Sequence, residues 1–464
     1  MTPNYDPSGC SMLPFHSACT SFRSGEDTPL AYLERCLETI AARDPVVQAW
    51  VVLNEEGARR QAEASSQRWR DGRPLSAIDG MPVGIKDLLE TCDMPTQMGC
   101  AAYAGNFPRR DNAAVWALRQ AGAIILGKTV TTELGGTHPG PTTNPFNPAH
   151  TPGGSSSGSA AAVGAGMVPV AIGSQVGGSI IRPASYCGNY ALKPSQGAIN
   201  RGERQATSMS THGPHAGCLE DMWAVAIEIA TRAGGDPGRS PLTGPPDLPA
   251  AHRPFVLAVM QTEGWSGLDE TARTTFEQVV SQIEDAGVAI LRREHEAALE
   301  RFEQMLVGVR DLATEITAWE NHWAMRSLVA QYPDAVSLRS QSVVATAERL
   351  GVHGYQDLLR RRRLVRREYA AFAPRVDTMI APASPGSAPL WSGDSAGKPL
   401  APTPTGDPVF NAPSSLLGAP AVTVPLTSVG ELPMGIQIMG QPGADARMAA
   451  IARWMRDAVR PVST

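Results

Sequence analysis

The sequence lacks the features that mark zinc knuckles, disulfide-stapled domains, membrane spans and nucleic-acid-binding surfaces. Its seven cysteines are scattered and form no C-x-x-C pair, so neither a zinc knuckle nor a disulfide framework is indicated. Residues 1–27 hold no apolar run long enough for a signal peptide or a membrane span. The net charge of −5 gives no sign of nucleic-acid binding. We therefore expect a cytoplasmic protein with reduced thiols that binds neither a membrane nor nucleic acid.

The composition is that of a well-packed globular protein, with 42% hydrophobic and 18% charged residues. Alternating helix and strand patterns predict an α/β fold in which helices flank a mixed sheet. The predicted helices are residues 28–42, 55–69, 115–121, 160–163, 219–230, 269–286, 297–326, 345–372 and 444–459. The predicted strands are residues 48–53, 80–86, 123–127, 168–172, 255–260, 288–291, 376–381, 420–425 and 433–439. Pro- and Gly-rich composition predicts loops at residues 135–152, 234–254 and 383–408.

The most informative stretch spans residues 153–193, which are small and almost uncharged. Two Gly/Ser loops flank the short predicted helix and strand: Gly-Gly-Ser-Ser-Ser-Gly-Ser at residues 153–159 and Gly-Gly-Ser at residues 177–179. Glycines let the backbone approach a ligand closely, and backbone N–H groups that point into free space form an oxyanion hole. A third segment, Pro-Val-Gly-Ile-Lys-Asp at residues 82–87, lies well upstream.

These three segments resemble the amidase signature family of serine hydrolases. The two loop serines are 179 − 155 = 24 residues apart, which is the spacing of the family, and further matching segments extend the resemblance over residues 28–459. Length alone favours two or three domains. The resemblance instead implies one amidase-signature domain at residues 28–464, with a central mixed sheet flanked by helices on both faces. Residues 1–27 would form a flexible arm, residues 80–215 the signature core, and residues 235–410 a variable region facing the substrate.

The resemblance also implies a catalytic Ser-cisSer-Lys triad. Ser179 fits the nucleophile, Ser155 fits the proton shuttle that follows a cis peptide bond, and Lys86 fits the base. A free lysine titrates near pH 10.4, so Lys86 must be buried in an uncharged pocket to supply a neutral amine. The implied oxyanion donors are Val176, Gly177, Gly178 and Ser179. Since a lysine and two serines suffice, neither a metal nor another cofactor is implied.

Two departures from the family pattern bear on the scaffold behind the nucleophile. Many relatives have a threonine and an acidic residue shortly before Gly-Gly-Ser, whereas this chain has Ser174 and Gln175. Many also have an arginine two residues after the nucleophile, whereas here Ile181 stands there and Arg182 follows. The hydrogen bonds that support the loop must therefore differ. The residues expected to contact substrate are Gly153, Gly154, Met98, Tyr103 and Trp391.

Residues 154–158 also fit the G-x-S-x-G nucleophile elbow, with Ser156 as nucleophile. An elbow needs a strand directly before it, but a Pro- and Asn-rich segment stands there, and the last histidine of the chain is as early as His353. We therefore expect His212 and His215 to be structural or to line a pocket.

Two further patterns have plain alternatives. Lys86 could be a surface lysine paired with Asp87, but the apolar residues before it favour burial. The arginines at residues 360–367 could form a nucleic-acid patch, but Leu358, Val365, Tyr369 and Phe372 make an apolar stripe, so the arginines are better interpreted as a solvated helix face.

The expected function is an amidase that hydrolyses a small-molecule carboxamide to a carboxylate and ammonia or an amine through a covalent acyl-enzyme. The alternative is the glutamine-hydrolysing subunit of a tRNA-dependent amidotransferase that works with a partner. A non-catalytic scaffold on the same fold is disfavoured because Lys86, Ser155 and Ser179 are all present. The resemblance implies a homodimer.

Overall fold

The protein is described by a computed structural model that covers residues 5–7, 12–203, 207–391 and 401–464. The strands are β1 (Trp50–Leu53), β2 (Pro82–Lys86), β3 (Ile124–Thr129), β4 (Val170–Gln175), β5 (Tyr190–Lys193), β6 (Thr211–Ala216), β7 (Val256–Val259), β8 (Ala289–Leu291), β9 (Thr378–Pro382), β10 (Ala421–Val424), β11 (Thr427–Val429), β12 (Leu432–Pro433), β13 (Ile436–Met439) and β14 (Val462–Ser463). The helices are α1 (Ala18–Ser24), α2 (Pro29–Val47), α3 (Glu55–Arg70), α4 (Ala113–Gln120), α5 (Ser157–Gly164), α6 (Ile181–Tyr186), α7 (Leu219–Ala233), α8 (Glu270–Asp285), α9 (Ala297–Leu306), α10 (Val309–Gln331), α11 (Leu338–Phe372), α12 (Ala412–Leu417) and α13 (Asp445–Ala458).

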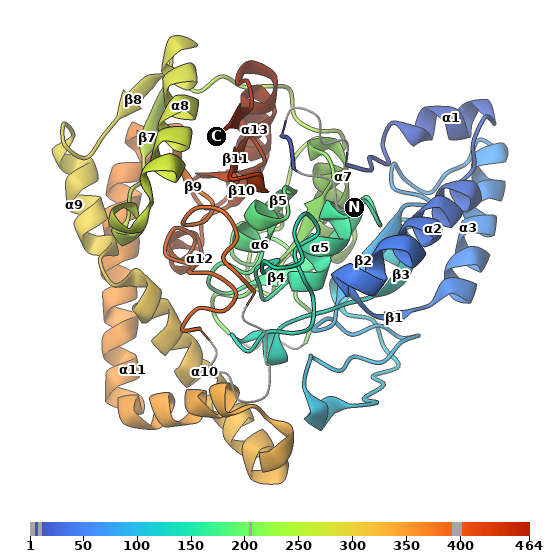
Figure 1. Ribbon diagram of the computed structural model, residues 1–464, viewed down its shortest axis with the longest axis horizontal. Coiled ribbons are helices and arrows are strands. Elements are labelled where there is room, and N and C mark those ends of the chain that lie inside the picture. Colours follow the sequence, from blue (N-terminus) through green and yellow to red (C-terminus); the bar gives the residue numbers. More distant parts are fainter. Residues whose placement is uncertain (1–4, 8–11, 204–206, 392–400) are drawn as a thin grey trace.

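An 11-stranded sheet crosses the molecule in the order β1-β3-β2-β4-β6-β5-β10-β13-β9-β7-β8 (Figure 1). Strand β2 runs parallel to both of its neighbours, β3 and β4, and β7 runs parallel to β8 and β9. The remaining neighbours in this sheet are antiparallel. The predicted α/β fold with a mixed sheet is therefore confirmed. Strands β12, β11 and β14 form a separate small sheet.

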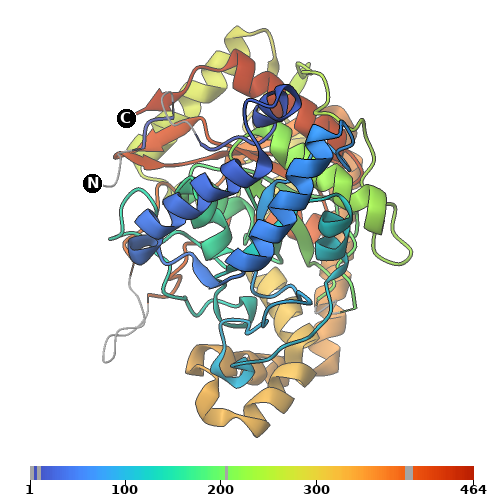
Figure 2. The ribbon, with the colours of Figure 1, turned by 90° about the vertical axis from the view of Figure 1, so that its right-hand side faces the viewer.

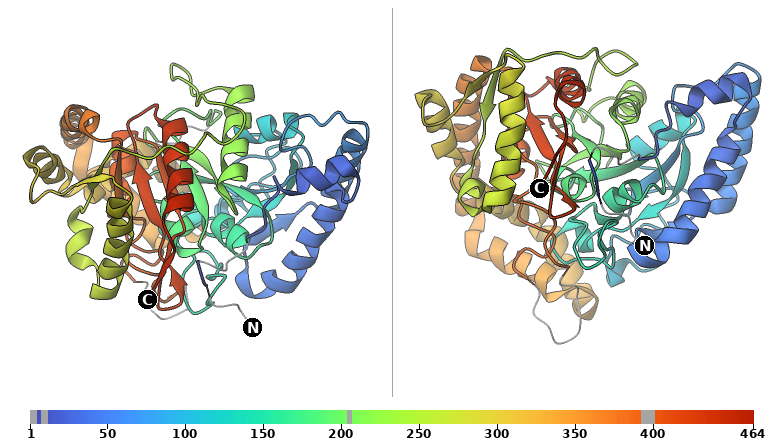
Figure 3. Two further views of the ribbon diagram at one scale, coloured as in Figure 1. Left: turned by 90° about the horizontal axis from the view of Figure 1, so that it is seen from above. Right: turned by 45° about the horizontal axis from the view of Figure 1, so that its top comes forward.

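Helices cover both faces of the large sheet (Figure 3). Strand β4 shows how the faces are divided, because Val170 and Ile172 pack in one cluster with α7, whereas Ala171 packs with the alanines of α5. Side chains alternate along a strand. In β2, Val83 and Ile85 join the cluster on the α7 side. Lys86 therefore points to the face that α5 covers.

Most of the predicted elements are present with shifted ends, but α1, α6, α12, β5, β6, β11 and β14 were not predicted. Strand β6 has the sequence Thr-His-Gly-Pro-His-Ala, and glycine and proline are unusual inside a strand. It is nonetheless a central strand, held between β4 and β5. Its neighbours in the sheet, and not its own composition, determine its conformation.

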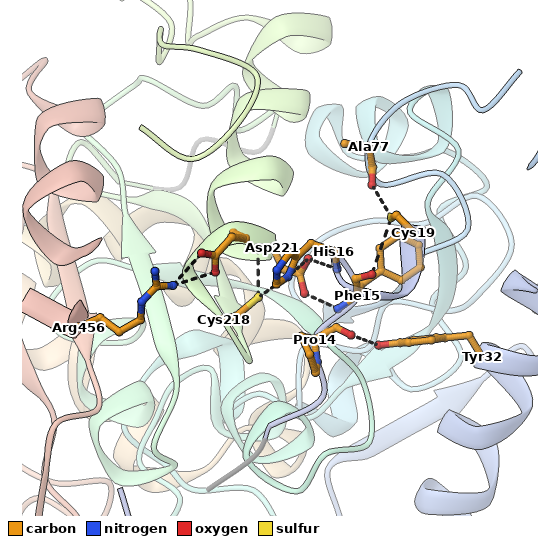
Figure 4. Close-up of polar contacts among 10 residues, drawn as sticks. Pro14, Phe15, His16, Cys19, Tyr32, Ala77, Cys218, Asp221 and Arg456 are labelled. Atoms are coloured by element: carbon orange, nitrogen blue, oxygen red, sulfur yellow. Dashed lines mark hydrogen bonds and ion pairs between the residues drawn. The ribbon is translucent and has the colours of Figure 1, made fainter. Parts of the chain in front are cut away.

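The flexible arm expected at residues 1–27 is packed from residue 12 onward, whereas residues 1–4 and 8–11 lie outside the described residues. Helix α1 forms within it, and Phe15 is fully buried in an aromatic cluster with Phe22 and Tyr32. The Asp221 carboxylate accepts hydrogen bonds from the backbone N–H groups of Phe15 at 2.6 Å and His16 at 2.9 Å (Figure 4). These contacts fasten residues 12–24 to α7, and Figure 2 shows α1 close to the paired helices α2 and α3.

The predicted helix at residues 297–326 is broken into α9 and α10 at Gly308, which has a φ of 70°. Helix α11 changes direction at Gly351, which has a φ of 60°. The predicted apolar stripe of α11 is confirmed, because Val365, Tyr369 and Phe372 are buried. Helices α10 and α11 pack together as a hairpin at one end of the molecule (Figure 1). Among the helices of the described ranges, none is long and apolar enough to cross a membrane.

Candidate active site

Lys86 ends β2 and is completely buried. Its Nζ lies 2.7 Å from Ser155 Oγ, 2.9 Å from Ser156 Oγ and 3.1 Å from Ser174 Oγ. The neighbouring carboxylate of Asp87 is paired instead with Lys128, at 2.9 Å. Burial, without a compensating carboxylate, lowers the pKa of Lys86 well below its ordinary value. The alternative of a surface lysine paired with Asp87 is therefore wrong.

Ser155 begins the turn that leads into α5. The peptide bond between Gly154 and Ser155 is cis, as the resemblance implied. The next residue, Ser156, is fully buried; besides contacting Lys86, its Oγ donates to the backbone carbonyl of Ser174 at 3.2 Å. No strand stands directly before this serine, so the nucleophile elbow is absent.

Ser179 lies on the loop between β4 and α6 and is partly exposed. Among the described residues, none provides an acceptor for the backbone N–H groups of residues 176–179 or a partner for the Ser179 hydroxyl. A methyl group at Gly177 would meet no atom closer than 4.0 Å, so open space lies beside the loop. Unpaired N–H groups next to open space are what an oxyanion requires.

Arg182 joins the two serine loops, although sequence analysis gave it no role. Its buried guanidinium donates to the carbonyl of Gly154 at 2.7 Å and to the carbonyl of Thr405 at 2.8 Å. A methyl group at Gly178 would lie 2.7 Å from its Nη1. The residues directly before Ser155 and Ser179 are thus held around one side chain. Many relatives have an arginine one position earlier, so the arginine at position 182 was the signal in the sequence that could have revealed this role.

Gln175 supports the loop from the end of β4 and is fully buried. Its Oε1 accepts the N–H groups of Ile180 at 2.8 Å and Ile181 at 3.0 Å. Its Nε2 donates to Ser415 Oγ at 3.1 Å. This amide therefore occupies the place where many relatives have an acidic residue.

Two of the residues expected to contact substrate, Gly153 and Gly154, directly precede Ser155, and the other three lie on segments that pack near this loop or near residue 134. Met98 is linked to this loop through residues 134 and 135. Its carbonyl accepts the N–H of Leu134, and a methyl group at the next residue, Gly135, would lie 3.8 Å from Ser155 Oγ. Tyr103 packs with Leu134 and with residues of the α10–α11 hairpin. Trp391 shares a small hollow with Gly153. Gly154 contacts Thr132 and Thr405, so all five expected residues border the serine loops or the segments packed on them.

Burial lowers the pKa values of His212 and His215 to about 3. Both imidazoles are therefore neutral near pH 7. His212 lines a cavity of about 510 Å³ together with Leu88, Arg110 and Arg232. As expected, one of the two histidines lines a pocket.

One group of described residues has side chains that suit a metal ion: His16, Cys218 and Glu220, whose ligand atoms lie within 4.8 Å of one another. Glu220, however, binds Arg456 through both carboxylate oxygens, and Cys218 Sγ accepts the N–H of Asp221 at the start of α7. The first contact joins α7 to α13 and the second caps α7, so both side chains have structural partners.

The fold and the lysine–serine arrangement define an α/β amidase. A family model described as Amidase matches residues 31–448, so the chain belongs to the amidase signature family. A glutamyl-tRNA(Gln) amidotransferase subunit from Chloroflexus aurantiacus is 30% identical, with 94% of each chain covered. The corresponding protein from Rhodopirellula baltica is 32% identical, with 92% of each covered. A crystal structure of an amidase superposes with a TM-score of 0.82 at 26% identity, covering 96% of this chain and 100% of that one.

Proposed function

We propose that the protein hydrolyses an uncharged carboxamide without a partner subunit, with Ser179 as nucleophile, Ser155 as proton shuttle and Lys86 as base. The observation that carries this proposal is the buried Lys86 Nζ, which lies 2.7 Å from Ser155 Oγ and forms no ion pair with a carboxylate of the described residues. A neutral amine at this place accepts a proton, whereas an ion-paired lysine would remain charged.

In the first half of the reaction, Ser179 Oγ bonds to the amide carbon and the carbonyl π electrons move to oxygen. The proton of Ser179 passes to Ser155 Oγ as the proton of Ser155 passes to Lys86 Nζ. The N–H groups of residues 176–179 bind the resulting oxyanion. When the C–N bond breaks, the leaving nitrogen takes a proton from Ser155, and Lys86 returns the proton it held.

In the second half, a water molecule attacks the acyl-enzyme, and its proton travels by the same route to Lys86. The bond between the acyl carbon and Ser179 Oγ breaks, and Ser179 regains a proton from Ser155 as Lys86 returns its proton to Ser155. The product leaves as a carboxylic acid, whose proton passes to the released ammonia or amine in solution. Lys86 ends neutral, so each turnover consumes one amide and one water and needs no cofactor.

The pairing of charges around the site supports an uncharged substrate. Arg310 forms an ion pair with Asp407 at 2.8 Å, beside the Pro408 that borders Gly177. The carboxylate of Glu133 accepts hydrogen bonds from the hydroxyls of Ser337 and Ser340. Arg310, Asp407 and Glu133 thus already have partners, whereas free glutamine brings both a carboxylate and an ammonium that need partners of their own.

The runner-up is the glutamine-hydrolysing subunit of an amidotransferase, which the names of the 30–32% identical relatives favour. The test is ammonia release by the purified chain from a panel of neutral aliphatic and aryl amides and from glutamine. We expect turnover of at least one neutral amide and none of glutamine. Activity that appears only with glutamine and a copurifying subunit would establish the runner-up instead.

A further inference from the structure

The side chain of Gln175 is the structural centre of the nucleophile loop. Both of its polar atoms are used twice: Oε1 accepts from the N–H groups of Ile180 and Ile181, and Nε2 donates to Ser415 Oγ at 3.1 Å and Ser414 Oγ at 3.4 Å. Because Gln175 precedes the loop and the two isoleucines follow Ser179, one amide closes the loop across its base.

Ser415 extends this support to the middle of the loop. Its Oγ donates to the carbonyl of Gly177 at 3.0 Å, which turns that carbonyl toward α12. In a planar trans peptide the C=O and the following N–H point in opposite directions. Anchoring the carbonyl of Gly177 on α12 therefore directs the N–H of Gly178 away from α12, leaving it unpaired among the described residues.

The two serines of α12, Ser414 and Ser415, determine which hydrogen-bonding groups the side chain at position 175 must offer. A hydroxyl has a single proton to donate. Ser415 donates its proton to the Gly177 carbonyl, and Ser414 donates its own to the carbonyl of Asn411 at 2.8 Å. Both oxygens can then only accept, so residue 175 must be a donor on this side and an acceptor on the side of Ile180. An amide meets both conditions, and a carboxylate does not.

Charge favours the amide for a second reason. The residue directly before it, Ser174, contacts Lys86 Nζ through its Oγ at 3.1 Å and its carbonyl at 3.4 Å. A buried carboxylate at position 175 would stabilise the protonated form of that lysine, whereas an amide leaves the pocket uncharged.

We propose that Gln175 is a positioning residue whose neutral amide, matched to Ser414 and Ser415, holds the oxyanion loop in its working shape. This inference rests on the proposed function, since it concerns the loop around the proposed nucleophile. It explains the departure at position 175 by hydrogen-bond polarity: here the loop is held by a group that donates as well as accepts.

The test compares Gln175→Glu with Gln175→Met and Ser415→Ala in purified protein. Gln175→Glu should lower kcat about 100-fold with little change in KM, as expected for misdirected oxyanion donors, and should move the rising limb of kcat against pH to higher pH. Gln175→Met should lower kcat but leave the limb in place, because it adds no charge. Ser415→Ala should give a smaller loss in kcat.

A double variant sharpens the test. The Ser415→Ala variant lacks the Ser415 Oγ, whose lone pairs would repel a carboxylate at position 175. Adding Gln175→Glu to this variant should therefore lower kcat less than it does in the wild-type background. The matched control is Gln261→Glu, a buried glutamine that follows the end of β7 and whose Nε2 donates to Glu294. It should lower the melting temperature without moving the pH limb.

The outcomes separate this inference from the proposed function. If Gln175→Glu and Gln175→Met both keep the wild-type kcat and pH profile while Ser179→Ala is inactive, the inference is overturned and the function stands. If the wild-type chain hydrolyses no amide and a fluorophosphonate fails to label Ser179, the proposed function fails. If Gln175→Glu does not fold, the inference is tested by the kcat and pH profile of Gln175→Met and Ser415→Ala. Wild-type values in both of these variants would equally overturn it.

Discussion

The Nζ of Lys86 lies 2.7 Å from Ser155 Oγ, although the residue next to it in the sequence is an aspartate. That aspartate, Asp87, is occupied by Lys128. A second buried lysine thus removes the one neighbouring carboxylate that would keep Lys86 protonated. The site therefore contains an amine surrounded by hydroxyls, which is the environment that a lysine base needs.

The first prediction concerns the pH dependence of activity. Burial lowers the pKa of Lys86, and the base works only when neutral, so kcat/KM should rise with pH along a limb whose apparent pKa lies below the 10.4 of a free lysine. Lys86→Arg should not restore activity, because a guanidinium stays protonated. Steady-state assays from pH 5 to pH 10 check both statements, and near-normal turnover by Lys86→Arg would contradict the assignment.

The second prediction concerns the nucleophile. Ser179→Ala should lose at least about a thousandfold in kcat, because no covalent intermediate can form, while its circular dichroism spectrum stays unchanged. A fluorophosphonate should label wild-type Ser179, as located by mass spectrometry of the digested protein. Ser156→Ala is the matched control for the elbow alternative. Labelling that survives in Ser179→Ala and disappears in Ser156→Ala would reverse the two assignments.

The parts that the sequence could predict are those in which one short segment carries its own signal. The two Gly/Ser loops and the segment before Lys86 were recognisable because their composition is local. Helix α8 was predictable for the same reason, and the Asp269 at which the predicted helix starts is its cap, since this side chain accepts the N–H of Ala272. Periodic apolar stripes likewise predicted α2 and α11, although α2 ends at Val47, five residues later than expected.

The support behind the loops could not be predicted, because it joins residues far apart in the sequence. Gln175 and Ser415 are separated by 240 positions, and Arg182 and Thr405 by 223. Nothing near Gln175 in the sequence shows that its amide will meet two hydroxyls whose protons are already used. The arm was misjudged for a related reason: its two phenylalanines lie in a polar, Ser-rich segment, and only the fold brings Tyr32 and Asp221 to them.

The third prediction tests whether the N-terminal segment is part of the folded core. Phe15 is completely buried, with its ring centroid 5.3 Å from that of Tyr32 and 5.6 Å from that of Phe22. Phe15→Ala should lower the free energy of unfolding by about 3–5 kcal/mol, as truncation of a buried phenylalanine does. Denaturant unfolding measures the change. The matched control, Phe255→Ala, removes a ring that is 67% exposed and should cost far less. Equal losses for the two variants would contradict the packed arrangement.

The last prediction follows from the free energy needed to bury the amine of Lys86. In the folded protein its pKa is lowered, so between that value and about 10.4 the unfolded chain binds the extra proton and burial of this side chain opposes folding. The penalty is full below the folded pKa, shrinks by about 1.4 kcal/mol per pH unit as the pH rises through this window, and vanishes above the unfolded pKa. Lys86→Met keeps a similar length without a titratable group. It should therefore unfold at higher denaturant concentration than the wild type at pH 6, and the difference should decline toward pH 10.

The matched control for Lys86→Met is the same substitution at Lys128, a second buried lysine that differs in having a carboxylate partner. Lys128→Met should destabilise the protein, because it leaves the buried Asp87 carboxylate unpaired. Opposite signs for the two variants at pH 6 would therefore separate an uncharged buried amine from an ion-paired one. If the stability difference between Lys86→Met and the wild type instead does not change between pH 6 and pH 10, then burial does not lower the pKa of Lys86, the amine is protonated in the folded state near neutral pH, and it cannot be the base of the proposed mechanism.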